Sequence, residues 1–134
     1  MFSRAEVEIA MELVREFLGR GTDSGYRFAV AEYDGGVIGY ACFGPIPCTV
    51  CSYDLYWIAV RPLRQRQGIG RKLVEQVERR IADEGGKRVY VDTSGRESYG
   101  PTRSFYERMG YLPVAVLPDF YAPGDAKTVY VKSL

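Results

Sequence analysis

The segment of residues 65–70 constrains the fold of this chain most, because it separates two segments of different hydrophobic period. Residues 55–60 before it are apolar and strand-like, whereas the segment from Arg71 has the apolar spacing of an amphipathic helix. The sequence therefore predicts a tight strand-to-helix turn. Gly68 and Gly70 would let its backbone approach a ligand, and the helix would offer unpaired N–H groups and the positive end of its dipole to an anion.

Cationic side chains surround this turn, namely Arg64, Arg66, Arg71 and Lys72. Together with the glycines they predict a phosphate-binding turn. A short Gly-x-Gly is weak evidence by itself, since a plain strand-to-helix turn that needs glycine for clearance has the same pattern. Both interpretations stay open at this point.

The whole chain predicts a mixed α/β (α+β) domain. Apolar spacing and turn signals predict a helix over about 3–18, strands over 27–33, 37–43 and 53–60, a helix from 71 to a Gly85-Gly86 stop, a strand over 87–93, a helix over about 101–109, and strands near 114–117 and 129–132. The strand–helix–strand unit around the glycine turn implies a right-handed parallel crossover, so the turn lies at the carboxyl end of the first strand, where open sheets bind ligands. A length of 134 residues fits a single domain over residues 1–134.

Two motifs in this chain resemble those of the GCN5-related N-acetyltransferases (GNAT). Val60, Arg61 and Pro62, followed by residues 65–70, look like the acetyl-coenzyme A signature of that family: Arg or Gln, two residues, Gly, one residue, and Gly or Ala. Residues 102–111 resemble the second signature, a short helix that carries Phe-Tyr-Glu and ends at Gly-Tyr or Gly-Phe. The resemblance covers about residues 26–134. It implies a mostly antiparallel central sheet with a βαβ acetyl-coenzyme A-binding core and flanking helices.

The start of the chain departs from the family pattern. Family members usually begin with an additional strand and helix, whereas this chain begins with what looks like the second helix, so the first strand has no counterpart among the expected elements. Two explanations stay open. Either the protein is naturally short at this end, or a second copy covers the exposed sheet edge in a homodimer, because an uncovered edge invites pairing.

The resemblance implies direct attack of an amine on acetyl-coenzyme A in a ternary complex. In the family pattern, backbone N–H groups of the glycine turn hold the pyrophosphate, and the pantetheine arm lies between the strand before the turn and the strand over 87–93. An N–H group from residues 58–60 would contact the thioester carbonyl as an oxyanion-type donor. The expected cofactor-binding residues are Ile58, Ala59, Val60, Gln65, Arg66, Gln67, Gly68, Ile69, Gly70 and Arg71.

Tyr106 matches the tyrosine that protonates the leaving thiolate in many members of the family. A phenol with an ordinary pKa of about 10 remains a proton donor at neutral pH. The alternative is that Phe105 and Tyr106 only pack one face of a short helix. The asparagine that the family often carries earlier in this region falls at Tyr99, which removes one expected cofactor contact.

Asp54 is the leading candidate for the general base. It lies in the strand before the turn, where some relatives carry a glutamate that accepts the amine proton directly or through water, and the chain has no histidine. Asp54 is equally well explained as a solvated residue at the start of a strand. Asp92 and Glu97 are weaker candidates for the same role.

Composition restricts the partners. With 18 basic and 17 acidic residues the formal net charge is +1, which does not favour nucleic acid or an anionic membrane as a partner. No long apolar run predicts a membrane span, and the polar start is unlike a secretion signal, so we expect a cytoplasmic protein. Cys48 and Cys51 have metal-site spacing, but only Cys42 could be a third ligand, so we expect no metal site.

The acceptor amine would be a small molecule, an amino acid or a peptide. Segments 42–51, 94–100 and 119–125 are expected loops that would shape its site, and the last of these combines aromatic rings with two carboxylates. Trp57 is expected in the core. An alternative from another functional class is a sensor or subunit that binds an acyl-coenzyme A and has lost turnover, since a fold does not guarantee chemistry.

Overall fold

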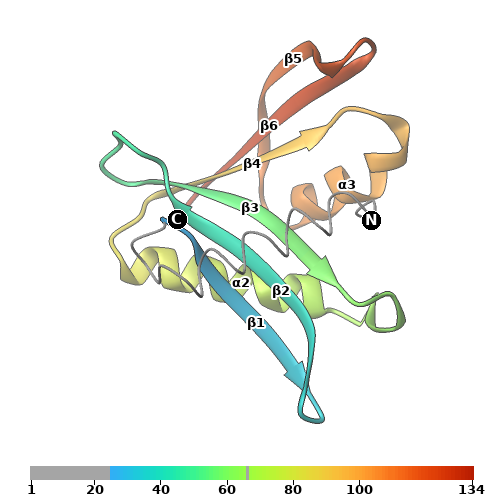
Figure 1. Ribbon diagram of the computed structural model, residues 1–134. Coiled ribbons are helices and arrows are strands. Elements are labelled where there is room, and N and C mark those ends of the chain that lie inside the picture. Colours follow the sequence, from blue (N-terminus) through green and yellow to red (C-terminus); the bar gives the residue numbers. More distant parts are fainter. Residues whose placement is uncertain (1–24, 66) are drawn as a thin grey trace.

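A computed structural model describes residues 25–65 and 67–134 of the chain. They form one six-stranded sheet in the order β1-β2-β3-β4-β6-β5, with two α-helices and two short 3-10 helices (Figure 1). The elements are β1 (Arg27–Tyr33), β2 (Gly36–Pro45), β3 (Ser52–Val60), η2 (Pro62–Arg64), α2 (Ile69–Asp83), β4 (Arg88–Ser94), η3 (Glu97–Tyr99), α3 (Gly100–Arg108), β5 (Leu112–Ala122) and β6 (Asp125–Ser133). The predicted helix over 3–18 and the question of the first strand lie outside the described residues.

The predicted mixed sheet is confirmed. Neighbouring strands are antiparallel except β3 and β4, which are parallel and are joined through α2. The apolar face of α2, made of Leu73, Val74, Val77 and Ile81, is fully buried in the core together with residues of the sheet. The crossover that the glycine turn predicts is therefore present.

The hairpin of β5 and β6 is longer than the sequence indicates. Residues 119–125 were expected to form a surface loop, but β5 extends to Ala122 and β6 begins at Asp125, and these two residues are paired. Asp119 adopts a φ of 57°, and its Oδ1 accepts a 2.7 Å hydrogen bond from the N–H of Gly124. The side-chain bond of Asp119 and the pair Ala122↔Asp125 thus hold a segment of low strand propensity in which the regular pairing is interrupted after Leu117. Similarly, β2 includes Cys42 and ends at Pro45, so the loop that follows begins at residue 46.

The sheet opens between β3 and β4. These strands pair only at Ser52↔Arg88, Tyr53↔Val89 and Asp54↔Tyr90. Beyond these pairs β3 remains paired with β2, and β4 with β6, so the two halves of the sheet diverge (Figure 1). A β-bulge at Tyr56 lies where the strands separate, and bulges increase local twist. The backbone edge of β3 from residue 55 to 60 consequently faces an opening.

Gly86 allows tight packing at the carboxyl end of α2, and its replacement by alanine should destabilise the fold. A Cβ atom there would lie 2.3 Å from Cγ2 of Ile81 and 2.7 Å from the ring of Tyr53, and both side chains are buried. Because a β-branched core side chain has little freedom to move aside, we expect Gly86→Ala to lower the free energy of unfolding by about 2 kcal/mol. Urea titration would measure the change. Gly36→Ala is the control, because its Cβ would have no neighbour closer than 3.8 Å, and equal losses in both variants would contradict this packing argument.

Candidate functional site

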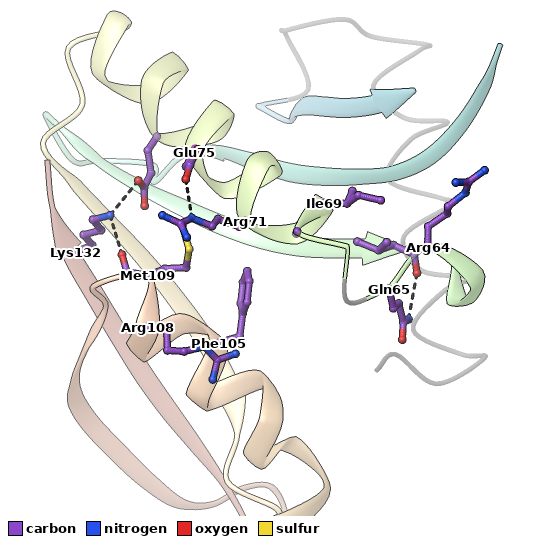
Figure 2. Close-up of a pocket in the computed structure, with 13 residues that line it drawn as sticks. Arg64, Gln65, Ile69, Arg71, Glu75, Phe105, Arg108, Met109 and Lys132 are labelled. Carbon is purple, nitrogen blue, oxygen red and sulfur yellow. Dashed lines mark hydrogen bonds and ion pairs between the residues drawn. The ribbon is translucent and has the colours of Figure 1, made fainter. Parts of the chain in front are cut away.

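Two neighbouring cavities lie at the opening of the sheet. The first has a volume of about 630 Å³ and is shown in Figure 2; it is lined by Val60, Arg64, Gln65, Gly68, Ile69, Gly70, Arg71, Glu75, Glu78, Phe105, Arg108, Met109 and Lys132. The second has a volume of about 420 Å³ and is lined by Tyr56, Trp57, Asp92, Thr93, Ser94, Arg96, Tyr99, Thr102, Tyr106, Tyr121 and Asp125. Helix α3 contributes Phe105 to the first cavity and the next residue, Tyr106, to the second.

The glycine turn presents uncapped N–H groups to the first cavity. Gly68 is the N-cap of α2, adopts a left-handed φ of 78°, and provides no side chain to cap the helix. The amide of Lys72 makes the first bond of the helix, a 3.1 Å contact with the carbonyl of Gly68. The N–H groups of residues 69–71 precede that bond, and such groups at a helix start, together with the helix dipole, attract anions.

Gly68 and Gly70 differ in backbone conformation and in their surroundings. Gly68 is required because its φ lies in the left-handed region, and nothing within 4 Å would obstruct a Cβ there. Gly70 lines the first cavity, and a Cβ there would be in ordinary van der Waals contact with Phe105 of α3, at 3.4 Å from its Cζ. The left-handed backbone therefore explains Gly68 but not Gly70, for which clearance for a ligand stays a prediction.

Four cationic and two acidic side chains line the first cavity. The guanidinium of Arg71 lies 3.0 Å from Glu75, and both side chains are largely exposed. The guanidinium of Arg64 stacks over the ring of Tyr33 at 4.3 Å from its centroid. Figure 2 shows Lys132 bound at the far side of this cavity, with its ammonium 2.8 Å from the carbonyl of Met109. The positive excess suits an anionic ligand.

Tyr106 is buried at the wall of the second cavity. Its ring makes edge contacts with Phe105, at 5.3 Å between centroids, and with Tyr111, at 5.7 Å. Burial raises the pKa of this phenol above its ordinary value of 10.0, since the charged phenolate is disfavoured away from water. The group is therefore a proton donor over the whole neutral range.

Asp54 and Asp92 form a pair of carboxylates where the strands separate. Asp54 lies opposite Tyr90 in the ladder, and Asp92 follows two residues farther along β4. Burial, and next the charge of Asp92, raise the pKa of Asp54 to about 6, while Lys127 acts in the opposite direction. Asp92 lines the second cavity and is paired with Lys127 at 3.3 Å. Asp54 itself lines neither cavity, so Asp92 is the carboxylate exposed to a ligand there.

The structure brings together only part of the expected cofactor set. Six of these residues line the first cavity: Val60, Gln65, Gly68, Ile69, Gly70 and Arg71. The side chain of Gln65 donates a 3.2 Å hydrogen bond to the carbonyl of Val60, and so ties the turn to the end of β3. Ile58, Ala59 and Gln67 line neither cavity, and Arg66 lies outside the described residues.

Three other residues have positions or contacts in the structure that the sequence does not reveal. Trp57, expected in the core, lines the second cavity from β3. Arg103 donates hydrogen bonds to the carbonyls of Ser94 and Arg96, at 2.7 and 2.8 Å, and thereby holds the loop after β4. Glu97 begins η3 and lines neither cavity.

The lining residues Glu78 and Lys132 are missing from the sequence-based set. They come from α2 and β6, and no sequence motif marks their positions. Only the strand order, with β6 between β4 and β5, brings Lys132 into the same cavity as the glycine turn.

Part of the negative charge in the second cavity is neutralised by other residues that line it. Asp125 accepts a hydrogen bond from the hydroxyl of Ser94 and forms a 3.2 Å ion pair with Arg96. Asp92 is less enclosed, and five aromatic side chains surround the same space: Tyr56, Trp57, Tyr99, Tyr106 and Tyr121. This combination of rings and a carboxylate can hold a cationic group.

Neither metal binding nor a membrane span has support in the described part of the chain. Among residues 25–65 and 67–134, no three His, Cys, Asp or Glu side chains are grouped so that they could hold a metal ion. Within the same ranges, no helix has the length and apolar character that crossing a bilayer requires.

Comparisons with known proteins agree with this geometry. A family model for the GNAT acetyltransferase domain matches residues 24–113. An uncharacterised N-acetyltransferase of Chlorobaculum tepidum is 37% identical over 65% of this chain, and an N-alpha-acetyltransferase of Sulfurisphaera tokodaii is 30% identical over 73% of it. The chain spans 50% and 64% of the lengths of these two curated relatives.

Solved structures extend the similarity over the whole fold. One from Desulfovibrio desulfuricans, described as belonging to the GNAT family of acetyltransferases, is 46% identical, has a TM-score of 0.95, and matches 99% of this chain and 84% of its own. A GNAT family acetyltransferase from Elizabethkingia anophelis, solved with acetyl-coenzyme A bound, has a TM-score of 0.75 over 92% of this chain and 82% of its own; at 18% identity it shows the fold alone. The glycine turn, the opened sheet and these matches together place the chain in the GNAT family of acetyltransferases.

Proposed function

We propose that this protein transfers an acetyl group from acetyl-coenzyme A to a primary amine, which attacks directly in a ternary complex. The observation that carries this proposal is the opening between β3 and β4, which has an anion-binding turn on one cavity and the buried phenol of Tyr106 on the adjacent one. Such an arrangement lets two substrates meet at one point without a covalent enzyme intermediate.

The residues of the first cavity fit coenzyme A. The uncapped N–H groups of residues 69–71 suit a pyrophosphate, and Arg64, Arg71 and Arg108 supply positive charge around it. Arg66 and Gln67 directly precede Gly68 in the sequence, and we propose that they also take part in binding the cofactor. The β3 edge that faces the opening offers backbone groups to an extended amide chain, much as a sheet edge binds a peptide. Ile58, Ala59 and Val60 lie on this edge, and we propose that one of their N–H groups binds the thioester oxygen.

From a neutral amine, the chemistry requires one proton to leave the nitrogen and one to reach the departing sulfur; an acceptor that arrives as an ammonium ion must first lose one further proton to water. Acetyl-coenzyme A would supply the acetyl group and leave as the free thiol. As the C–N bond forms and the C–S bond breaks, we propose that the Oη of Tyr106 gives its proton to the sulfur. We propose that the amine proton passes through water toward the pair of Asp54 and Asp92, and that Tyr106 then regains a proton from solvent.

The acceptor is proposed to be a small-molecule or peptide amine that is cationic before it reacts. The second cavity surrounds such a group with aromatic rings and the carboxylate of Asp92, which favour a cation on arrival. Loss of one ammonium proton to water then frees the nitrogen lone pair for attack, and the proton released as the amide forms can pass to this carboxylate and Asp54. A cavity of about 420 Å³ suits a small amine or the end of a peptide.

Cofactor binding should raise the thermal stability of the protein, and loss of the glycine turn should abolish that effect. At about one hundred times its dissociation constant a ligand stabilises by about 2.7 kcal/mol, which corresponds to a rise in Tm of about 10 °C for a domain of this size. We expect Gly68→Ala to remove most of the rise, because its φ of 78° is strained for alanine.

Gly124→Ala is the matched control for this experiment. Gly124 also has a φ of 78°, is equally open, and lines neither cavity. Both variants should lose similar intrinsic stability, but Gly124→Ala should keep the full rise with acetyl-coenzyme A. A rise that survives in both variants would remove the turn from the cofactor site.

Tyr106→Phe should lower kcat by about a hundred-fold, because a general acid typically contributes at least that much. Thiol release from acetyl-coenzyme A would be followed with a panel of primary amines that includes amino acids, aliphatic diamines and short peptides. The KM for acetyl-coenzyme A should remain within about two-fold, since the phenol lines the other cavity. Turnover equal to that of the unaltered protein would exclude the acid role. Cofactor binding without thiol release for any amine would instead favour a non-catalytic coenzyme A-binding protein.

Asp54→Asn should stabilise the fold increasingly as pH rises. The folded-state pKa of Asp54 is raised from 3.8 to about 6, so protonated Asp54 favours the fold fully below pH about 3.8, and this contribution disappears as pH rises through about 6. Asparagine does not titrate. The free energy of unfolding of Asp54→Asn relative to the unaltered protein should therefore increase between pH 4.5 and 7.5, measured by urea titration. Asp83→Asn, at an exposed site at the end of α2, is the control, and parallel pH curves for all three proteins would refute the shift.

A further inference from the structure

We infer that Tyr111, Glu78 and Lys132 form a positioning network that holds the ring of Tyr106 at the wall of the second cavity. This inference rests on the proposed acid role of Tyr106. None of the three is proposed to give a proton to the substrate, and Tyr111 lines neither cavity. It would therefore act through Tyr106.

The end of α3 brings Tyr111 back onto Tyr106. Gly110 follows the helix with a left-handed φ of 96°, and the N–H of Tyr111 then donates a 3.0 Å hydrogen bond to the carbonyl of Tyr106. A glycine in this conformation is the usual way to end a helix and reverse the chain. The reversal stacks the edge of one ring against the other, with an angle of 68° between their planes.

Tyr111 is fixed in turn by α2. Its side chain is 1% exposed, and its hydroxyl donates a 2.8 Å hydrogen bond to Oε2 of Glu78. A hydrogen bond to a carboxylate is shorter and stronger than one between neutral groups. Burial first, and then the charge of Glu78, raise the pKa of Tyr111 above its ordinary value, so that it remains a donor.

The second oxygen of Glu78 completes a closed circuit that returns to α3. Oε1 lies 3.0 Å from the ammonium of Lys132, which also donates a 2.8 Å hydrogen bond to the carbonyl of Met109, the residue that caps α3 (Figure 2). The circuit therefore joins α3, α2 and β6 around one buried ring. The Glu78 side chain is only 13% exposed, so water competes weakly for these bonds.

Such a circuit matters for a proton donor, because transfer needs heavy atoms at hydrogen-bond distance and small displacements are costly. The ring of Tyr106 packs between Phe105, which lines the cofactor-side cavity, and Tyr111. Release of Tyr111 would let the Tyr106 ring shift along the wall. Replacement of Tyr111 by phenylalanine would break its hydrogen bond to Glu78. The shape of the core would stay nearly the same, because phenylalanine lacks only the hydroxyl of tyrosine.

The test is a double-mutant cycle of Tyr106→Phe and Tyr111→Phe, with the best acceptor from the amine panel. In the unaltered background we expect Tyr111→Phe to lower kcat by about ten-fold and to leave the KM for acetyl-coenzyme A within about two-fold. In the Tyr106→Phe background it should have no further effect, because the group that it positions is gone. An equal loss of kcat in both backgrounds would mean a general structural role and would overturn the inference.

Tyr130→Phe is the matched control. Tyr130 of β6 is also buried and lines neither cavity. Its hydroxyl donates a 3.0 Å hydrogen bond to Glu107 of α3. Its loss should leave kcat within about two-fold. A ten-fold loss for Tyr130→Phe as well would show that any phenol–carboxylate bond to α3 has this effect, and would contradict a specific circuit.

A second readout separates this inference from the proposed reaction. With ring-labelled tyrosine, the NMR signal of Tyr106 is identified by its loss in Tyr106→Phe. Its shift and ring-flip rate should change in Tyr111→Phe and stay constant in Tyr130→Phe. If no amine is acetylated but these changes appear, the positioning holds and the proposed reaction fails. If the Tyr106 signal is unchanged in Tyr111→Phe, the positioning fails whatever the activity.

Discussion

The separation of β3 from β4 after only three paired residues is the feature on which the rest of the site depends. Parallel strands joined by a helix normally pair along their length, and full pairing would close the edge of β3 with backbone hydrogen bonds. Here a bulge at Tyr56 adds twist to β3 at the place where pairing stops. The opening leaves backbone groups of β3 available, and residues of β3, β4 and α3 line the cavities beside it.

The opened sheet also organises the charges. On the side of the glycine turn, the helix start and the arginines make an environment that favours an anion. At the point of separation, two aspartates lie close enough that one of them resists ionisation. A buried phenol on α3 lines the second cavity and stays protonated. The reaction proposed above would use an anion-binding site, a proton acceptor and a proton donor, and the groups proposed for these roles lie on different elements.

Local signals in the sequence were sufficient for most of the fold. The period change on either side of residues 65–70 predicted β3, α2 and the crossover, and the turn at Asp34 and Gly35 predicted the hairpin of β1 and β2. The sequence did not predict the long hairpin of β5 and β6, because Pro118 and Asp119 have low strand propensity and lie at an irregularity between the paired residues Leu117 and Ala122. Of the site, sequence motifs indicated the turn and Tyr106. Glu78 and Lys132 could not be found that way, since their meeting depends on strand order, and a bulge such as that at Tyr56 has no local signature.

The place of β6 between β4 and β5 has a consequence for how the protein is made. Of the six described strands, the one that completes the interior of the sheet is synthesised last, and it carries Lys132 to a cavity whose turn lies about 60 residues earlier. Contacts of such large sequence separation form late, because the entropy of closing the intervening loop must be overcome first. On the ribosome, β1 to α2 can assemble while β4 still lacks its neighbour. The side of this cavity that Lys132 forms can therefore be completed only after the residues of β6 have left the exit tunnel.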